Sequence, residues 1–76
     1  MTGEPWTGLA KRSFSLAGHR TSVALEPAFW AALEQIAASR SQRLSTLVAT
    51  TDAARPPGQP LASALRLLAL SAPHSG

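Results

Sequence analysis

The chain contains no cysteine, and its two histidines, His19 and His74, lie far apart in the sequence. The absence of cysteine excludes disulfides and thiolate metal sites. Because neither histidine has other ligands clustered around it, we expect no metal site and no metal cofactor. A chain of 76 residues forms one small domain, a size at which a single-chain core is marginal. Oligomerisation is therefore the expected source of further stability.

Long apolar runs and converging catalytic groups are also missing. No apolar run reaches the ~18 residues of a membrane span, and the N-terminus lacks a signal-peptide core, so we expect a cytoplasmic protein without a membrane partner. The chain has only 4 carboxylate residues, scattered among apolar segments. No Gly-rich phosphate loop is present, and no serine or threonine has a base at a plausible spacing. We therefore expect no catalytic residues, no cofactor and no enzymatic activity.

Basic residues exceed acidic ones, with 7 Lys and Arg against 4 Asp and Glu and a net charge of +3. This excess favours a polyanionic partner, although a small soluble protein with a few extra arginines has the same balance. The positions are more informative. Lys11, Arg12 and Arg20 precede or lie on the strand predicted over residues 19–25, whereas most of the acids follow it.

The hydrophobic period changes within the stretch from His19 to Trp30. Val23 and Leu25 are apolar on one face of an alternating segment, and the other face carries Arg20, Ser22 and Ala24. This period of two predicts a half-buried strand over residues 19–25.

Two helix patterns follow the strand. Glu26 can cap the first helix and Pro27 suits its first position, and apolar residues at helical spacing then predict a helix over 27–39. Leu44, Leu47 and Val48, with Thr51 one turn on, predict a second helix over 43–54.

The flanking segments differ in character. Residues 1–10 are expected to form a flexible arm in which Trp6 docks on its own fold or on a neighbouring subunit. Residues 11–16 alternate again and form either a first strand or an extended arm crossing a partner, with Ala17 and Gly18 able to turn the chain. The proline-rich segment 56–60 stops the second helix. Residues 61–70 then form a third, apolar helix, and residues 71–76 a tail.

A lone strand followed by two amphipathic helices leaves both strand edges unpaired, so pairing with the same strand of a second chain is favoured. The order of these elements, and the run GHRTSVALEPAFW over residues 18–30, resemble the ribbon-helix-helix superfamily of the Arc and MetJ repressors. The resemblance covers residues 11–70 and is closest to a bacterial subgroup of small domains with this motif and a third apolar segment. It implies a mostly α, α+β fold over residues 11–55 plus a C-terminal third helix. The expected assembly is an intertwined homodimer with a two-stranded antiparallel ribbon between subunits.

The resemblance also implies a function, a transcriptional regulator that inserts its ribbon into the major groove of double-stranded DNA. It assigns base contacts to the outward strand residues Arg20, Ser22 and Ala24. It assigns phosphate contacts to the start of the second helix, at Arg43, Leu44 and Ser45. Further phosphate contacts are expected from Lys11, Arg12 and His19, with a structural or solvated role equally open for His19.

Apolar residues of the strand and helices are expected at the oligomer interface; they are Val23, Leu25, Phe29, Trp30, Leu33, Leu47, Val48, Leu61, Leu65 and Leu68. The third helix offers a route to tetramers or larger assemblies. The alternative function is a protein-interaction module, as in antitoxin-like relatives, whose third helix binds a partner. A membrane-surface helix is a more distant alternative, because Arg66 is the only charge of this segment.

Overall fold

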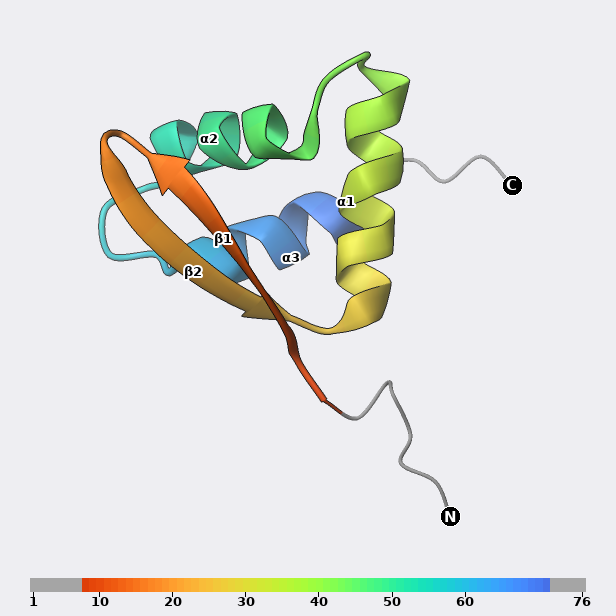
Figure 1. The fold of residues 1–76 in the computed structure, drawn as a ribbon, viewed down its shortest axis with the longest axis horizontal. Helices are drawn as coiled ribbons and strands as arrows, with labels where there is room; N and C mark the ends of the chain where they lie inside the picture. Colours follow the sequence, from red (N-terminus) through yellow and green to blue (C-terminus); the bar gives the residue numbers. More distant parts are fainter. Residues whose placement is uncertain (1–7, 72–76) are drawn as a thin grey trace.

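The computed structural model of the chain describes residues 8–71. Its elements are β1 (Ala10–Leu16), β2 (His19–Leu25), α1 (Pro27–Ser39), α2 (Leu44–Ala54) and α3 (Leu61–Ser71). Figure 1 shows the two-stranded ribbon crossing in front of α3, with α2 above it and α1 standing steeply beside both. The predicted fold, an antiparallel ribbon followed by helices and closed by a third C-terminal helix, is confirmed. The ribbon was expected between the subunits of an intertwined homodimer, whereas the structure forms it from two consecutive strands of one chain. Trp6, His74 and the rest of segments 1–7 and 72–76 lie outside the described residues.

The ribbon forms within one chain. β1 and β2 pair antiparallel, from Ala10 opposite Leu25 to Leu16 opposite His19. The turn between them has positive φ at both residues, 51° at Ala17 and 82° at Gly18. These signs are those of a type I′ turn, whose twist matches that of the strands it joins. Segment 11–16, left open between strand and arm, is thus a strand, and it gives β2 a partner that does not come from a second chain.

One face of the ribbon is apolar and packs on the helices. Phe14 and Leu16 from β1 and Val23 and Leu25 from β2 are all buried. β1 contacts α2, and β2 contacts α3. The period of two therefore separates a helix-facing side of the ribbon from a solvent-facing side.

The three helices complete the core of the single chain. Most of the residues predicted for an oligomer interface are buried here by the chain's own elements; they are Val23, Leu25, Trp30, Leu33, Leu47, Val48, Leu61 and Leu65. Phe29 and Leu68 are half-buried and pack against the same cluster. A second subunit is not needed to explain why these side chains avoid water. None of the helices in residues 8–71 is long and apolar enough to cross a bilayer.

α1 begins as expected at Pro27, but its cap differs from the prediction. Glu26 occupies the N-cap position, and its side chain makes no capping hydrogen bond. Its carboxylate instead accepts a hydrogen bond of 3.0 Å from Nε of Arg66 on α3. The Glu26 side chain therefore joins the start of α1 to the third helix.

After the last helical residue of α1 and its C-cap, the chain reverses at Ser41, where φ is 55°. The backbone N–H of Gln42 donates to the carbonyl of Ala37 at 2.8 Å, and that of Ser41 donates to Ala38 at 3.0 Å. This pair of bonds is the Schellman arrangement, in which glycine usually occupies the left-handed position. α2 then starts at Leu44, after an N-cap residue, Arg43, that makes no side-chain capping bond.

Candidate nucleic-acid interface

The face of the ribbon that points away from the helices is polar. The strand register pairs Lys11 with Ala24, Ser13 with Ser22 and Ser15 with Arg20. Ala24 is half-buried and the other members of this set are exposed. We call these six residues, Lys11, Ser13, Ser15, Arg20, Ser22 and Ala24, the outward face.

Cross-strand contacts order the side chains of the outward face. The hydroxyl oxygens of Ser13 and Ser22 lie 3.1 Å apart, within hydrogen-bonding distance. Arg20 donates from Nη1 to Oγ of Ser15 over 3.3 Å. Because a guanidinium carries five N–H donors, this contact leaves most of them available to another acceptor. The outward face therefore offers hydroxyl groups and an oriented guanidinium on a two-stranded ribbon.

The structure places the predicted base-contacting residues, Arg20, Ser22 and Ala24, together on this face, and it adds residues that the sequence did not assign. Ser13 and Ser15 were not candidates, because segment 11–16 was not fixed as a strand. Lys11 was assigned to phosphate only, although it has the same strand parity as both serines. If segment 11–16 is taken as a strand, its period of two places Lys11, Ser13 and Ser15 on the outward face.

Arg12 lies on the opposite side of the ribbon. Its Nη1 contacts Oε2 of Glu34 on α1 at 2.7 Å, and its guanidinium carbon lies 5.0 Å from the centroid of the Trp30 ring. A cation over an indole at this distance is an attractive contact. Trp30 in turn donates its indole N–H to the carbonyl of Ala10 at 2.7 Å. Arg12 thus links β1 to α1, and its phosphate contact stays a prediction.

The remaining predicted phosphate residues lie outside the outward face. His19 is exposed next to the turn, paired with Leu16 in the register. Arg43 and Ser45 are exposed at the start of α2, whereas Leu44 packs partly against the core. Because no side chain caps this helix, its first amide groups keep the partial positive charge of a helix N-terminus.

Charges are distributed unevenly over the described residues. Every carboxylate in residues 8–71 is paired with an arginine, in the pairs Glu34–Arg12, Asp52–Arg55 and Glu26–Arg66. The backbone N–H of Glu26 itself, together with Arg66, holds the pKa of the Glu26 carboxyl below its ordinary value of 4.5. Lys11, Arg20, Arg40 and Arg43 have no carboxylate partner in this part of the chain. The unpaired positive charge is therefore on the ribbon, at the end of α1 and at the start of α2.

The described part of the chain brings together no group of three or more His, Asp or Glu side chains that could hold a metal ion. The polar chemistry of the site thus consists of hydroxyl, guanidinium and ammonium groups. These groups suit hydrogen bonding to base edges and phosphates.

A comparison with protein families agrees with this architecture. No curated protein and no solved structure matches the chain. The model of a protein family described as "Ribbon-helix-helix domain" matches residues 9–72, which include both strands and all three helices. The match covers most of the 76 residues, and the chain therefore belongs to the ribbon-helix-helix domain family.

Proposed function

We propose that the protein is a small transcriptional regulator that binds DNA sequence-specifically as a homodimer, with the outward face of its ribbon in the major groove. Family membership supports DNA binding at the general level, since ribbon-helix-helix proteins typically bind DNA as dimers. The observation that carries the specific proposal is the polar outward face, with Arg20 oriented by Ser15 and the Ser13 and Ser22 hydroxyls in contact.

The side chains of the outward face differ in the contacts that they can make with base edges. Arg20 can donate two hydrogen bonds to O6 and N7 of guanine. Ser13 and Ser22 can each donate or accept, so they discriminate bases less strongly. Ala24 offers only a methyl group, which suits contact with the thymine methyl. Arg20 is therefore the main determinant of sequence in this proposal.

The width of the major groove favours insertion of the two-stranded ribbon of one chain over a wider ribbon made by two chains. The major groove is about 12 Å wide and admits a two-stranded ribbon. If two copies were joined edge to edge through β2, the resulting four strands would span three gaps of about 4.8 Å, roughly 14 Å, before side chains are added. We therefore propose that each subunit inserts its own ribbon, so that a homodimer contacts two half-sites.

Phosphate contacts complete the proposed complex. The uncapped start of α2, at Arg43, Leu44 and Ser45, can direct backbone N–H groups at a phosphate. Lys11 at the end of the ribbon and His19 near the turn are further candidates. These contacts position the protein on the duplex but do not select its sequence.

The first test is selection of fragmented genomic DNA by the purified protein at ~150 mM salt, where binding to phosphates alone is weakened. Enrichment of a short inverted repeat is the expected result. Failure to enrich any sequence, with folded protein, would count against DNA recognition.

Substitution of Arg20 tests the ribbon directly. On the selected site, Arg20→Ala is expected to lose about 1–3 kcal/mol of binding free energy. Arg40→Ala removes the same charge from an exposed position at the end of α1 and serves as the matched control. Equal affinities for the two variants would remove the outward face from the mechanism.

A further inference from the structure

A groove of about 470 Å³ lies between α2 and α3, on a part of the molecule that contains no ribbon residue. The last turns of α2 form one wall, α3 forms the other, and the connection between them closes one end. Arg40, the C-cap residue of α1, also borders the groove. Its apolar lining includes Ala54, Pro56, Ala64, Leu67 and Leu68.

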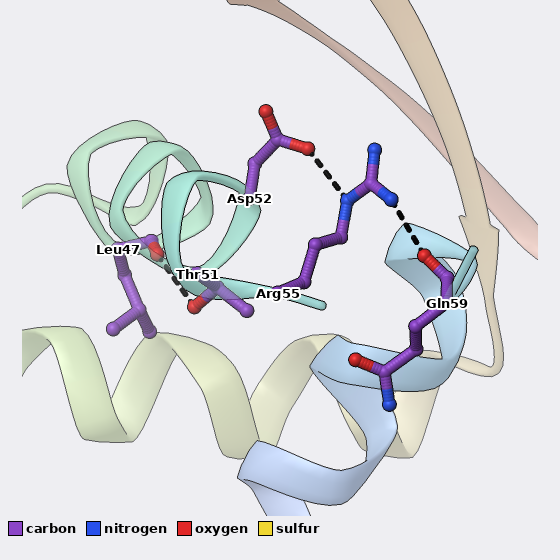
Figure 2. Close-up of polar contacts among 5 residues, drawn as sticks. All are labelled: Leu47, Thr51, Asp52, Arg55 and Gln59. Carbon is purple, nitrogen blue, oxygen red and sulfur yellow. Dashed lines mark hydrogen bonds and ion pairs between the residues drawn. The ribbon is translucent and has the colours of Figure 1, made fainter. Parts of the chain in front are cut away.

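The polar groups at the groove are mostly satisfied by the chain itself, as Figure 2 shows. Arg55 contacts Oδ1 of Asp52 through Nε at 2.8 Å and donates from Nη1 to the carbonyl of Gln59 at 2.6 Å. Thr51 donates its hydroxyl to the carbonyl of Leu47 at 2.9 Å. These bonds neutralise the charge of Arg55 and hold the connection between α2 and α3. The surface left for a ligand at this end is therefore chiefly apolar.

α3 leaves large apolar side chains in water beside this groove. Leu67, which lines it, is 56% exposed, and Leu70 on the next turn is 68% exposed. The opposite face of the helix is buried through Leu61, Leu65 and Ala69. Since exposed leucines next to an apolar groove lower their free energy when covered, this side of α3 suits an apolar ligand.

The unpaired positive charge of Arg40 favours a ligand that carries a carboxylate. Arg40 has no carboxylate partner within residues 8–71, whereas Arg55 is already paired. A second copy of this chain has no unpaired carboxylate among its own described residues to offer Arg40. A partner that brings both apolar side chains and a carboxylate fits the groove better than a second copy does.

We propose that the groove between α2 and α3 binds an acidic amphipathic helix of a partner protein. Its apolar side chains fill the groove against Leu67 and Leu68, and a carboxylate pairs with Arg40. Helix-in-groove recognition is a common mode of binding between proteins. Because no ribbon residue lines the groove, this binding does not depend on DNA binding, and a single chain is able to hold both ligands.

Two synthetic helical peptides test the proposal on the isotope-labelled full chain by NMR. Both peptides carry the same leucine face; one has glutamates and the other lysines at the polar positions. The glutamate peptide is expected to bind about tenfold more tightly than the lysine peptide. Amide shifts are expected at Thr50, Ala64 and Leu67. Equal binding of the two peptides, binding of neither, or shifts confined to other surfaces would overturn the proposal.

Charge reversal separates a specific contact from general attraction. Arg40→Glu is expected to reverse the preference between the peptides. Arg43→Glu, an equally large charge change outside the groove, should leave the glutamate peptide preferred. Leu67→Ser should weaken binding of the glutamate peptide, with retained circular dichroism as evidence that the chain is folded. If sedimentation shows that wild-type protein self-associates and Leu67→Ser does not, a second copy occupies the groove and the proposed partner is wrong.

Discussion

Ala17 and Ser41 adopt positive φ angles of 51° and 55° without being glycines. For residues with a Cβ atom this left-handed conformation is strained. Both residues lie in tight reversals, one between the strands and one after α1. The strand pair Leu16–His19 holds the first reversal, and the backbone hydrogen bonds of Ser41 and Gln42 to α1 hold the second.

Substitution of Ser41 by glycine should therefore stabilise the protein. Removing Cβ relieves about 1–2 kcal/mol of left-handed strain, and the greater freedom of glycine in the unfolded chain offsets about 0.4–1 kcal/mol of this. We expect Ser41→Gly to raise the free energy of unfolding in urea by a net amount of about 0.5–1 kcal/mol. Ala38→Gly, at an exposed helical position two residues before the C-cap, should lower it. A Ser41→Gly variant less stable than wild type would contradict this account of the turn.

The lowered pKa of Glu26, caused first by its own backbone N–H and then by Arg66, predicts that stability depends on pH. The pKa of Glu26 is lower in the folded chain than its ordinary value of 4.5. Its contribution to stability is therefore fully present above that value and is lost as the pH falls through the lower pKa of the folded state. The stability gap between wild type and Glu26→Gln should shrink between neutral and acidic pH. Urea unfolding of both proteins across that range checks this, and a gap that stays constant would show that Glu26 titrates normally.

Residue roles on the ribbon were only partly predictable from the sequence. Alternation over 19–25 was clear enough to place Arg20, Ser22 and Ala24 on one face. Arg12 was assigned to phosphate because of its charge, although it shares strand parity with the apolar residues Phe14 and Leu16. Its contacts with Glu34 and Trp30 join residues distant in sequence, and no local pattern reveals them.

Among the elements, the helices were more predictable than the pairing of the strands. Pro27 and the proline-rich segment 56–60 mark boundaries locally, because proline lacks an N–H and has a fixed φ. A short alternating segment such as 11–16 fits a strand and an extended arm equally well. Its pairing is decided by the turn at Ala17 and Gly18 and by the burial of Phe14 and Leu16 against the helices.

The hairpin should be sensitive to substitution of Gly18. This residue has a φ of 82°, and an added Cβ would meet no heavy atom within 4 Å. The cost of Gly18→Ala is therefore one of backbone conformation and not of steric overlap, about 1–2 kcal/mol. Gly8→Ala, which also meets open space but has no positive φ, is the matched control. Equal urea midpoints for the two variants would contradict the assigned turn.

α3 illustrates what an amphipathic pattern leaves undecided. Its leucines cover more than one face, so the sequence alone fits either burial from several sides or a subunit contact. The structure divides them, with Leu61 and Leu65 in the core and Leu67 and Leu70 exposed. Deleting this helix would remove core residues, so point substitutions at the exposed leucines are the informative way to study its surface.

At the scale of the whole molecule, the paired carboxylates determine where positive charge remains available. Arginines bound to Glu26, Glu34 and Asp52 connect elements of the chain, so the net charge of +3 does not describe any one surface. Lys11 and Arg20 concentrate unpaired charge on the ribbon, and Arg40 lies beside the groove. The two proposed ligands, DNA and an acidic helix, therefore contact different positively charged side chains.

The intrachain ribbon has a consequence for how the protein forms. When a DNA-binding ribbon is formed by strands of two chains, folding requires an encounter between two molecules and becomes slower as the protein is diluted. Here the strands are consecutive and joined by a two-residue turn, so their pairing closes a very short loop. Each newly synthesised chain can assemble its ribbon and core by a first-order process, even when only a few copies are present in a cell.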